Sequence, residues 1–222
     1  MSNRQSPRAE DLPPREWFDR WWDPPEFFEG VNRHSQGISP VDFFGKAELK
    51  PLREAYAAGL FSLILGQQDL PVAVRLDGDR FPDFNLRIGD ELCLFEIVEA
   101  YPPGQKRGDE YKEAARRKAE GLPEVMEEFD PQEEERAAIP VIVEAVRKKA
   151  EKNYQPPPCL LVYVNFWLFR EPVLSPREFA ERLNPWGEKF QQTWLLWGAN
   201  AIRCRPDPVR FFAHSLPSWL VP

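Results

Sequence analysis

The sequence has few histidines and cysteines and no glycine-rich loop, and each shortage argues against a class of site. The two histidines, His34 and His214, lie near opposite ends of the chain without metal-ligand spacing, which argues against a zinc site or a histidine-dependent triad. The three cysteines, Cys93, Cys159 and Cys204, are far apart and each lies in an apolar segment, so we expect buried, reduced thiols. Without a phosphate-binding glycine loop, hydrolysis of nucleoside triphosphates has no support.

The chain also lacks long apolar runs and an excess of positive charge. No apolar stretch approaches the roughly 18 residues of a membrane span, and the N-terminus shows no basic-then-apolar signal pattern. Together with the reduced thiols, this predicts a soluble, cytoplasmic protein without membrane association. The net charge of −7 argues against a general electrostatic attraction to nucleic acid, although it is compatible with a local basic groove.

Length and composition predict one main domain with appendages. The 222 residues, 42% of them hydrophobic, are enough for one substantial core. We place an N-terminal arm at residues 1–45, an α/β domain at 46–212 and a C-terminal tail at 213–222. The arm is rich in proline and carries a cluster of aromatic residues: Trp17, Phe18, Trp21, Trp22, Phe27 and Phe28. Either these aromatics pack onto the main domain, or the arm docks a protein partner.

Hydrophobic periodicity predicts helices on both faces of a β-sheet. Apolar residues recur at three- and four-residue steps across residues 48–65, which indicates an amphipathic helix. Three antiparallel strands should follow, and the third, apolar on both faces, should lie inside the sheet. The expected strands are 72–76, 82–88, 91–99, 159–168, 194–197 and 201–205, and the further helices are 109–121, 133–154 and 176–183. This order predicts a three-layer α/β fold.

Glu96 lies inside an apolar run, residues 92–99, that otherwise predicts a buried strand. A buried carboxylate needs a partner, a proton or a metal ion. Asp83 opens the preceding strand, and the tight connection at 88–91 would bring the two acids side by side. Such a pair suits a divalent cation, because hard cations prefer oxygen ligands. Alternatively, Asp83 caps a turn and Glu96 pairs with a buried arginine. Glu99 is a third possible acid for this site, but we rank it below Glu96 because strand alternation places it on the opposite face of the strand from Glu96.

Lys149 is the cation that the helical pattern places closest to this pair. The long helix carries one apolar stripe, formed by Ala138, Ile139, Ile142, Val146 and Ala150. On a helical wheel Lys149 falls near the centre of that stripe, whereas Lys148 and Lys152 fall outside it. Either its stem packs on apolar surface while the ammonium reaches water, or the ammonium meets the acid pair.

Pro82-Asp83 followed by Glu96-Ile97-Val98, within the order helix, hairpin, central strand, helix and strand, resembles the PD-(D/E)XK nuclease superfamily. The resemblance covers residues 46–205. It implies a restriction-endonuclease-like fold, in which a mixed sheet is flanked by helices. It also implies a magnesium or manganese ion held by Asp83, Glu96 and the carbonyl of Ile97.

The usual lysine of that superfamily lies two residues after the glutamate, where this sequence has Val98. Some members carry the lysine on a neighbouring helix instead, and Lys149 suits that position. The resemblance therefore implies metal-dependent phosphodiester hydrolysis of nucleic acid, DNA in preference to RNA, with Asp83, Glu96 and Lys149 as the catalytic groups. The alternative is a non-catalytic nuclease-fold module acting through protein-protein contacts, which Val98 and the acidic charge balance favour.

Overall fold

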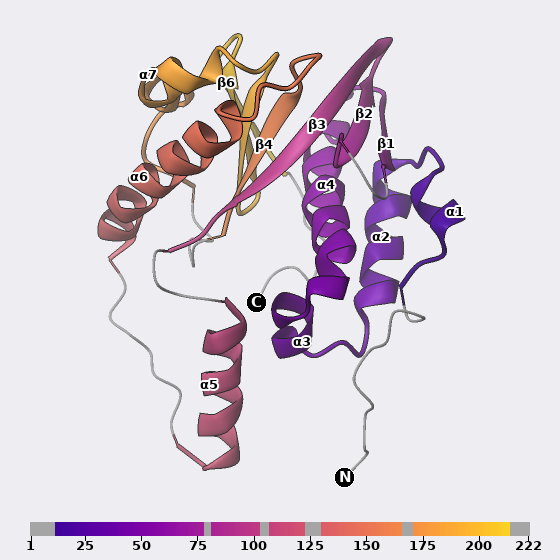
Figure 1. Ribbon diagram of the computed structural model, residues 1–222, viewed down its shortest axis with the longest axis vertical. Coiled ribbons are helices and arrows are strands. Elements are labelled where there is room, and N and C mark those ends of the chain that lie inside the picture. The colour runs from indigo at the N-terminus through magenta and orange to yellow at the C-terminus, as the bar shows by residue number, and fades with distance from the viewer. Residues whose placement is uncertain (1–11, 78–80, 103–106, 123–129, 166–170, 214–222) are drawn as a thin grey trace.

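A seven-stranded mixed sheet forms the centre of the computed structural model, which describes residues 12–77, 81–102, 107–122, 130–165 and 171–213 (Figure 1). The strands follow chain order in space, and their bounds are β1 Val72–Leu76, β2 Phe84–Ile88, β3 Glu91–Ala100, β4 Cys159–Val164, β5 Thr193–Trp197, β6 Asn200–Arg205 and β7 Val209–Phe212. The pairs β3–β4 and β4–β5 are parallel, and all other neighbours are antiparallel.

Helices cover both faces of the sheet. One face packs against α4 (Lys50–Gly66), which is backed by α2 (Pro24–Ser35), and the other packs against α6 (Pro131–Ala150) and α7 (Pro176–Gly187). The remaining helices are α1 (Arg15–Phe18), α3 (Pro40–Gly45), the 3-10 turn Ala47–Leu49 and α5 (Arg107–Ala119). Strand alternation divides the core in two, and the three layers confirm the predicted α/β fold with a mixed sheet.

The aromatic N-terminal segment contributes to the main core. Phe27 and Phe28 are 0% and 1% exposed and pack with α4 under the sheet. Trp22 exchanges two backbone hydrogen bonds with Val74, which ties the segment to the edge strand β1. Of the two alternatives for this segment, the structure agrees with packing onto the main domain. The middle of α4 is therefore buried all round, since α2 covers the side that an amphipathic helix would expose to water.

Several boundaries differ from the predicted ones. The expected strand 82–88 begins at Phe84, whose partner Leu76 is the last residue of β1. The expected helix 133–154 ends at Ala150, and Tyr154 lies in the loop that follows. The expected helix 176–183 continues to Gly187, although Pro185 lies within it. Strand β7 and helices α1 to α3 were not predicted, and part of the expected strand 159–168 lies outside the described residues.

Replacing Gly59 by alanine tests the packing of α2 on α4. An added Cβ would lie 2.9 Å from Cδ2 of Phe28 and 3.1 Å from Cδ1 of Phe27, both in buried rings that cannot bend away. Alanine gains about 1 kcal/mol of helix propensity, whereas overpacking a core typically costs about 1–3 kcal/mol. We therefore expect Gly59→Ala to lower the free energy of unfolding, by up to about 2 kcal/mol in urea denaturation.

Gly66→Ala on the same helix is the matched control. Its added Cβ would meet Cγ of Pro24 at 3.6 Å, an ordinary van der Waals contact. We expect this variant to keep or gain stability. An equal gain from Gly59→Ala would contradict the close approach of α2 and α4.

Candidate functional site

The site begins where β2 stops pairing with β3. Phe84 and Phe95 form the last pair of that ladder, so Asp83 stands opposite Glu96 just beyond it. There the backbone N–H of Ile97 donates to Oδ2 of Asp83 at 2.7 Å. A side-chain carboxylate thus replaces the missing strand as the acceptor for β3. The hairpin register brings Asp83 and Glu96 together as the sequence predicted.

Glu96 is 6% exposed and accepts two hydrogen bonds from outside the hairpin. Nζ of Lys149, at the end of α6, lies 2.5 Å from Oε2 of Glu96, and the hydroxyl of Tyr154 donates to the same oxygen at 2.8 Å. The Lys149 side chain is only 14% exposed, so its ammonium meets the acid rather than reaching water. The buried partner of Glu96 is thus a lysine, and the alternative that expected an arginine is wrong on this point.

Tyr154 is held in its protonated form. Burial and its hydrogen bond to the Glu96 carboxylate raise the pKa of the Tyr154 hydroxyl well above its ordinary value. The ring also stacks on Phe81, with centroids 5.4 Å apart, and Phe81 is 37% exposed. Tyr154 is therefore a fixed donor to Glu96 and carries an aromatic surface beside it.

Helix α4 brings a third acid and a second lysine near Asp83. Nζ of Lys50 lies 2.5 Å from Oε1 of Glu54, whose side chain is 21% exposed. Burial raises the pKa of Glu54, and the charge of Asp83 raises it further. Burial likewise raises the pKa of Asp83, with Glu96 adding to the rise, while the Ile97 hydrogen bond and the two lysines, Lys50 and Lys149, oppose it. The acids are crowded and partly desolvated.

Sequence reasoning missed Glu54, Lys50 and Tyr154. Lys50 and Glu54 have the spacing of an ordinary surface pair on a helix, and Tyr154 reads as the end of a helix. Their place beside the hairpin follows from how α4 and the end of α6 pack, for which the sequence contains no local pattern.

Glu99 lies away from this cluster. It is exposed and accepts a hydrogen bond from Nδ2 of Asn165, and strand alternation places it on the opposite face of β3 from Glu96. Val98 shares the face of Glu96 and packs against the apolar cluster beneath α6 and α7. The position two residues after Glu96 is thus filled by an apolar side chain.

The donor set suits a hard divalent cation. Asp83 and Glu96 offer carboxylate oxygens, the backbone of Ile97 offers a carbonyl, and Glu54 lies within electrostatic reach of Asp83. A nearby cation would stabilise the ionised form of such crowded carboxylates, whose pKa values are raised. Within the described residues, however, no three or more histidine, cysteine, aspartate or glutamate side chains already form a metal-binding group.

The basic clusters and the cysteines considered from the sequence are not part of this site. The helical basic clusters are largely neutralised by their own helices, since Arg116 pairs with Glu113 and Glu120, and Arg147 with Glu144. The three cysteines, Cys93, Cys159 and Cys204, are buried and free, as expected. His214 lies outside the described residues.

Comparisons with known proteins give no family for this chain. No family model matches it, and neither the curated proteins nor the solved structures contain a significant match. Among the helices of the described residues, none is long and apolar enough to span a membrane. The case for a function therefore rests on the geometry of the site.

Asp83→Asn tests whether the acid pair is strained. A carboxyl group whose pKa is higher in the folded than in the unfolded protein destabilises the fold when it ionises. The amide keeps an acceptor for the N–H of Ile97 and removes the charge. We expect the variant to melt at a higher temperature than the wild type at neutral pH. The difference should shrink as the pH falls toward about 4, near the unfolded pKa of aspartate.

Asp90→Asn, at an exposed position in the β2–β3 turn, is the control and should change the melting temperature little at either pH. A lower melting temperature for Asp83→Asn than for the wild type at neutral pH would contradict the strain.

Proposed function

We propose that the chain hydrolyses phosphodiester bonds in nucleic acid with a divalent metal ion, magnesium or manganese. Asp83, Glu96 and the carbonyl of Ile97 would hold the ion. The observation that carries the proposal is the ion pair between Lys149 and Glu96, beside Asp83 and at the point where two strands separate. A buried ion pair adds little stability over an apolar pair of similar size, which supports a functional reason for these charges.

Each residue would have a distinct task. When bound, the metal ion would polarise a phosphoryl oxygen and lower the pKa of a bound water. Lys149 would neutralise charge that develops on the phosphoryl group in the transition state. Tyr154 orients Glu96 through its hydrogen bond, and the N–H of Ile97 orients Asp83. We propose DNA, in preference to RNA, as the substrate. We also propose that the chain acts in the cytoplasm.

The alternative is a nuclease-fold module that binds protein partners without catalysis. Val98 at the usual lysine position favours it, as does the net charge of −7. Under this alternative Lys149 has only a structural task, the neutralisation of Glu96. The aromatic rings of Phe27 and Phe28 would take no part in docking, because they are buried against α4.

Glu96→Gln against Glu99→Gln tests the metal site. The two glutamates lie three residues apart on β3 and face opposite sides of the sheet, so the pair is matched in chemistry. We expect Glu96→Gln to abolish magnesium- or manganese-dependent cleavage of labelled DNA, and Glu99→Gln to retain most of it. Metal ion at 100 times its dissociation constant should stabilise the wild type by about 2.7 kcal/mol, and this gain should be lost in Glu96→Gln. Identical melting curves with and without metal would contradict the proposal.

Lys149→Met tests the lysine. Methionine keeps much of the apolar stem and removes the ammonium, so the rate should fall by about 10²–10³ when assayed below the melting temperature of the variant. Lys148→Met is the control, because that side chain is 67% exposed on the same helix, and it should cleave like the wild type. Loss of stability in Lys149→Met with an unchanged rate would assign the lysine a purely structural task and favour the non-catalytic alternative.

A further inference from the structure

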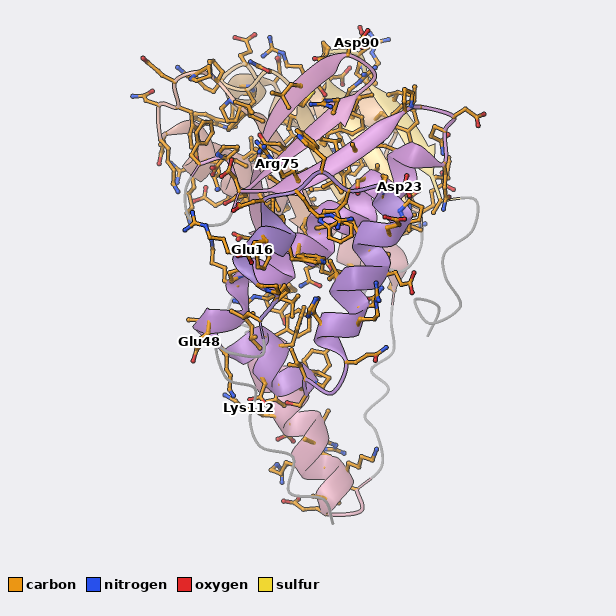
Figure 2. The ribbon with its side chains drawn as sticks, turned by 90° about the vertical axis from the view of Figure 1, so that its right-hand side faces the viewer. Glu16, Asp23, Glu48, Arg75, Asp90 and Lys112 are labelled. Atoms are coloured by element: carbon orange, nitrogen blue, oxygen red, sulfur yellow. The ribbon has the colours of Figure 1, made fainter. Side chains whose placement is uncertain are left out.

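The sheet face that carries Glu96 extends past α6 onto β2 and β1. Residues directly opposite one another in a ladder share a face, as do alternate residues of one strand. Asp83 stands beside Glu96, and Asn85 and Arg87 follow it at steps of two along β2. Arg75 of β1 is the partner of Asn85. Both arginines therefore lie on the face of the acid pair, at the β1 edge that Figure 2 views, where Arg75 is labelled.

Trp21 lies over these two arginines. The guanidinium carbon of Arg87 is 4.6 Å from the centroid of the Trp21 ring, and that of Arg75 is 5.0 Å from it. The next residue, Trp22, is fixed to Val74 by two backbone hydrogen bonds, so the main chain holds Trp21 above the strands. Trp21 remains partly exposed. The cluster is thus a fixed aromatic ring with two cations.

Among the described residues neither Arg75 nor Arg87 forms an ion pair with a carboxylate, whereas Arg116 and Arg147 each contact glutamates of their own helix. Guanidinium groups without a carboxylate partner bind phosphate through paired hydrogen bonds. In a chain of net charge −7 such a local patch is the place where a polyanion would be tolerated.

The aromatic ring narrows the class of ligand. A flat indole stacks on a nucleobase only where the base is free of its duplex neighbours, which is the usual mode in single-strand recognition. A second aromatic surface, exposed Phe81 stacked on Tyr154, lies at the other end of this face, next to Glu96. Phosphate-binding cations between two aromatic surfaces fit a strand whose bases are unpaired.

We propose that Trp21, Arg75 and Arg87 bind a single-stranded segment of nucleic acid and lead it to Asp83 and Glu96. This inference rests on the proposed function for its choice of ligand. Arg87 is four residues from Asp83 along the chain, about 14 Å at roughly 3.4 Å per residue. A strand that contacts both would therefore span only a few nucleotides, and the unpaired region can be short.

Binding is tested by fluorescence anisotropy on the full chain, with a fluorescein-labelled single-stranded oligothymidine and a duplex of equal length. EDTA prevents cleavage during the titration. The double variant Arg75→Gln and Arg87→Gln should weaken single-strand binding and reduce the slope of log affinity against log salt by about 1.4, at about 0.7 per phosphate contact. The matched control, Arg177→Gln with Arg182→Gln on α7, removes the same charge and should change neither quantity.

The stacking contribution is tested at Trp21. Trp21→Ala should weaken single-strand binding by about 5- to 150-fold, and Trp21→Phe, which keeps an aromatic ring, by less. Arg87→Gln alone provides a readout should either tryptophan variant fold poorly, because Arg87 is exposed. Equal affinity of the wild type for duplex and single strand would overturn the single-strand assignment. Affinities unchanged in every variant, or no binding of either oligonucleotide, would overturn the inference.

Cleavage separates this inference from the proposed function. If the single strand binds through Trp21, Arg75 and Arg87 but neither magnesium nor manganese supports cleavage, the binding surface stands and the proposed function fails. If the wild type cleaves and the double arginine variant keeps its KM and its salt dependence, the proposed function stands and the binding surface fails.

Discussion

The burial of one carboxylate, that of Glu96, is the constraint on which the arrangement around the site depends. An ionised carboxylate inside a strand cannot be left without donors, because the cost of removing it from water exceeds what packing returns. The chain supplies those donors from two places, the last turn of α6 and the loop after it, through Lys149 and Tyr154. The end of α6 is thereby fixed to β3, the strand that precedes the α5 and α6 crossover to β4.

The same region holds more negative charge than its lysines balance. Asp83 and Glu54 both have raised pKa values because burial disfavours their charged forms and each acid opposes a neighbour. Lys149 is engaged with Glu96, and Lys50 with Glu54, so Asp83 is left with a backbone N–H as its direct partner. A stable scaffold has no need of such an arrangement, whereas a site that recruits a cation does. This excess of negative charge favours a chemical role for the cluster over a purely structural one.

The residues that the sequence located are those governed by local periodicity. Strand alternation across a short hairpin suffices to pair Asp83 with Glu96, and a helical wheel suffices to turn Lys149 toward the sheet. Both placements follow from the side-chain period of a strand or a helix, which can be read within one or two elements. Glu54 and Tyr154 depend instead on the packing of α4 and on where α6 ends, and the sequence of either segment is compatible with other placements. Helix α2 does carry a local signal, because its buried residues Pro24, Phe27, Phe28 and Val31 recur at three- and four-residue steps. They lie in a proline-rich segment, which led us to expect an arm instead of a helix.

The site lies at a boundary on the sheet. On one side α6 and α7 cover β3, β4 and their neighbours with an apolar layer, to which Val98 belongs. On the other side β1 and β2 carry Arg75 and Arg87, with Trp21 lying over them. A ligand that approaches along the second side meets cations first and then the acid cluster at the edge of the first. Lys149 stands at that edge because Glu96 holds it there, so the interaction that satisfies a buried acid also places an ammonium close to Asp83.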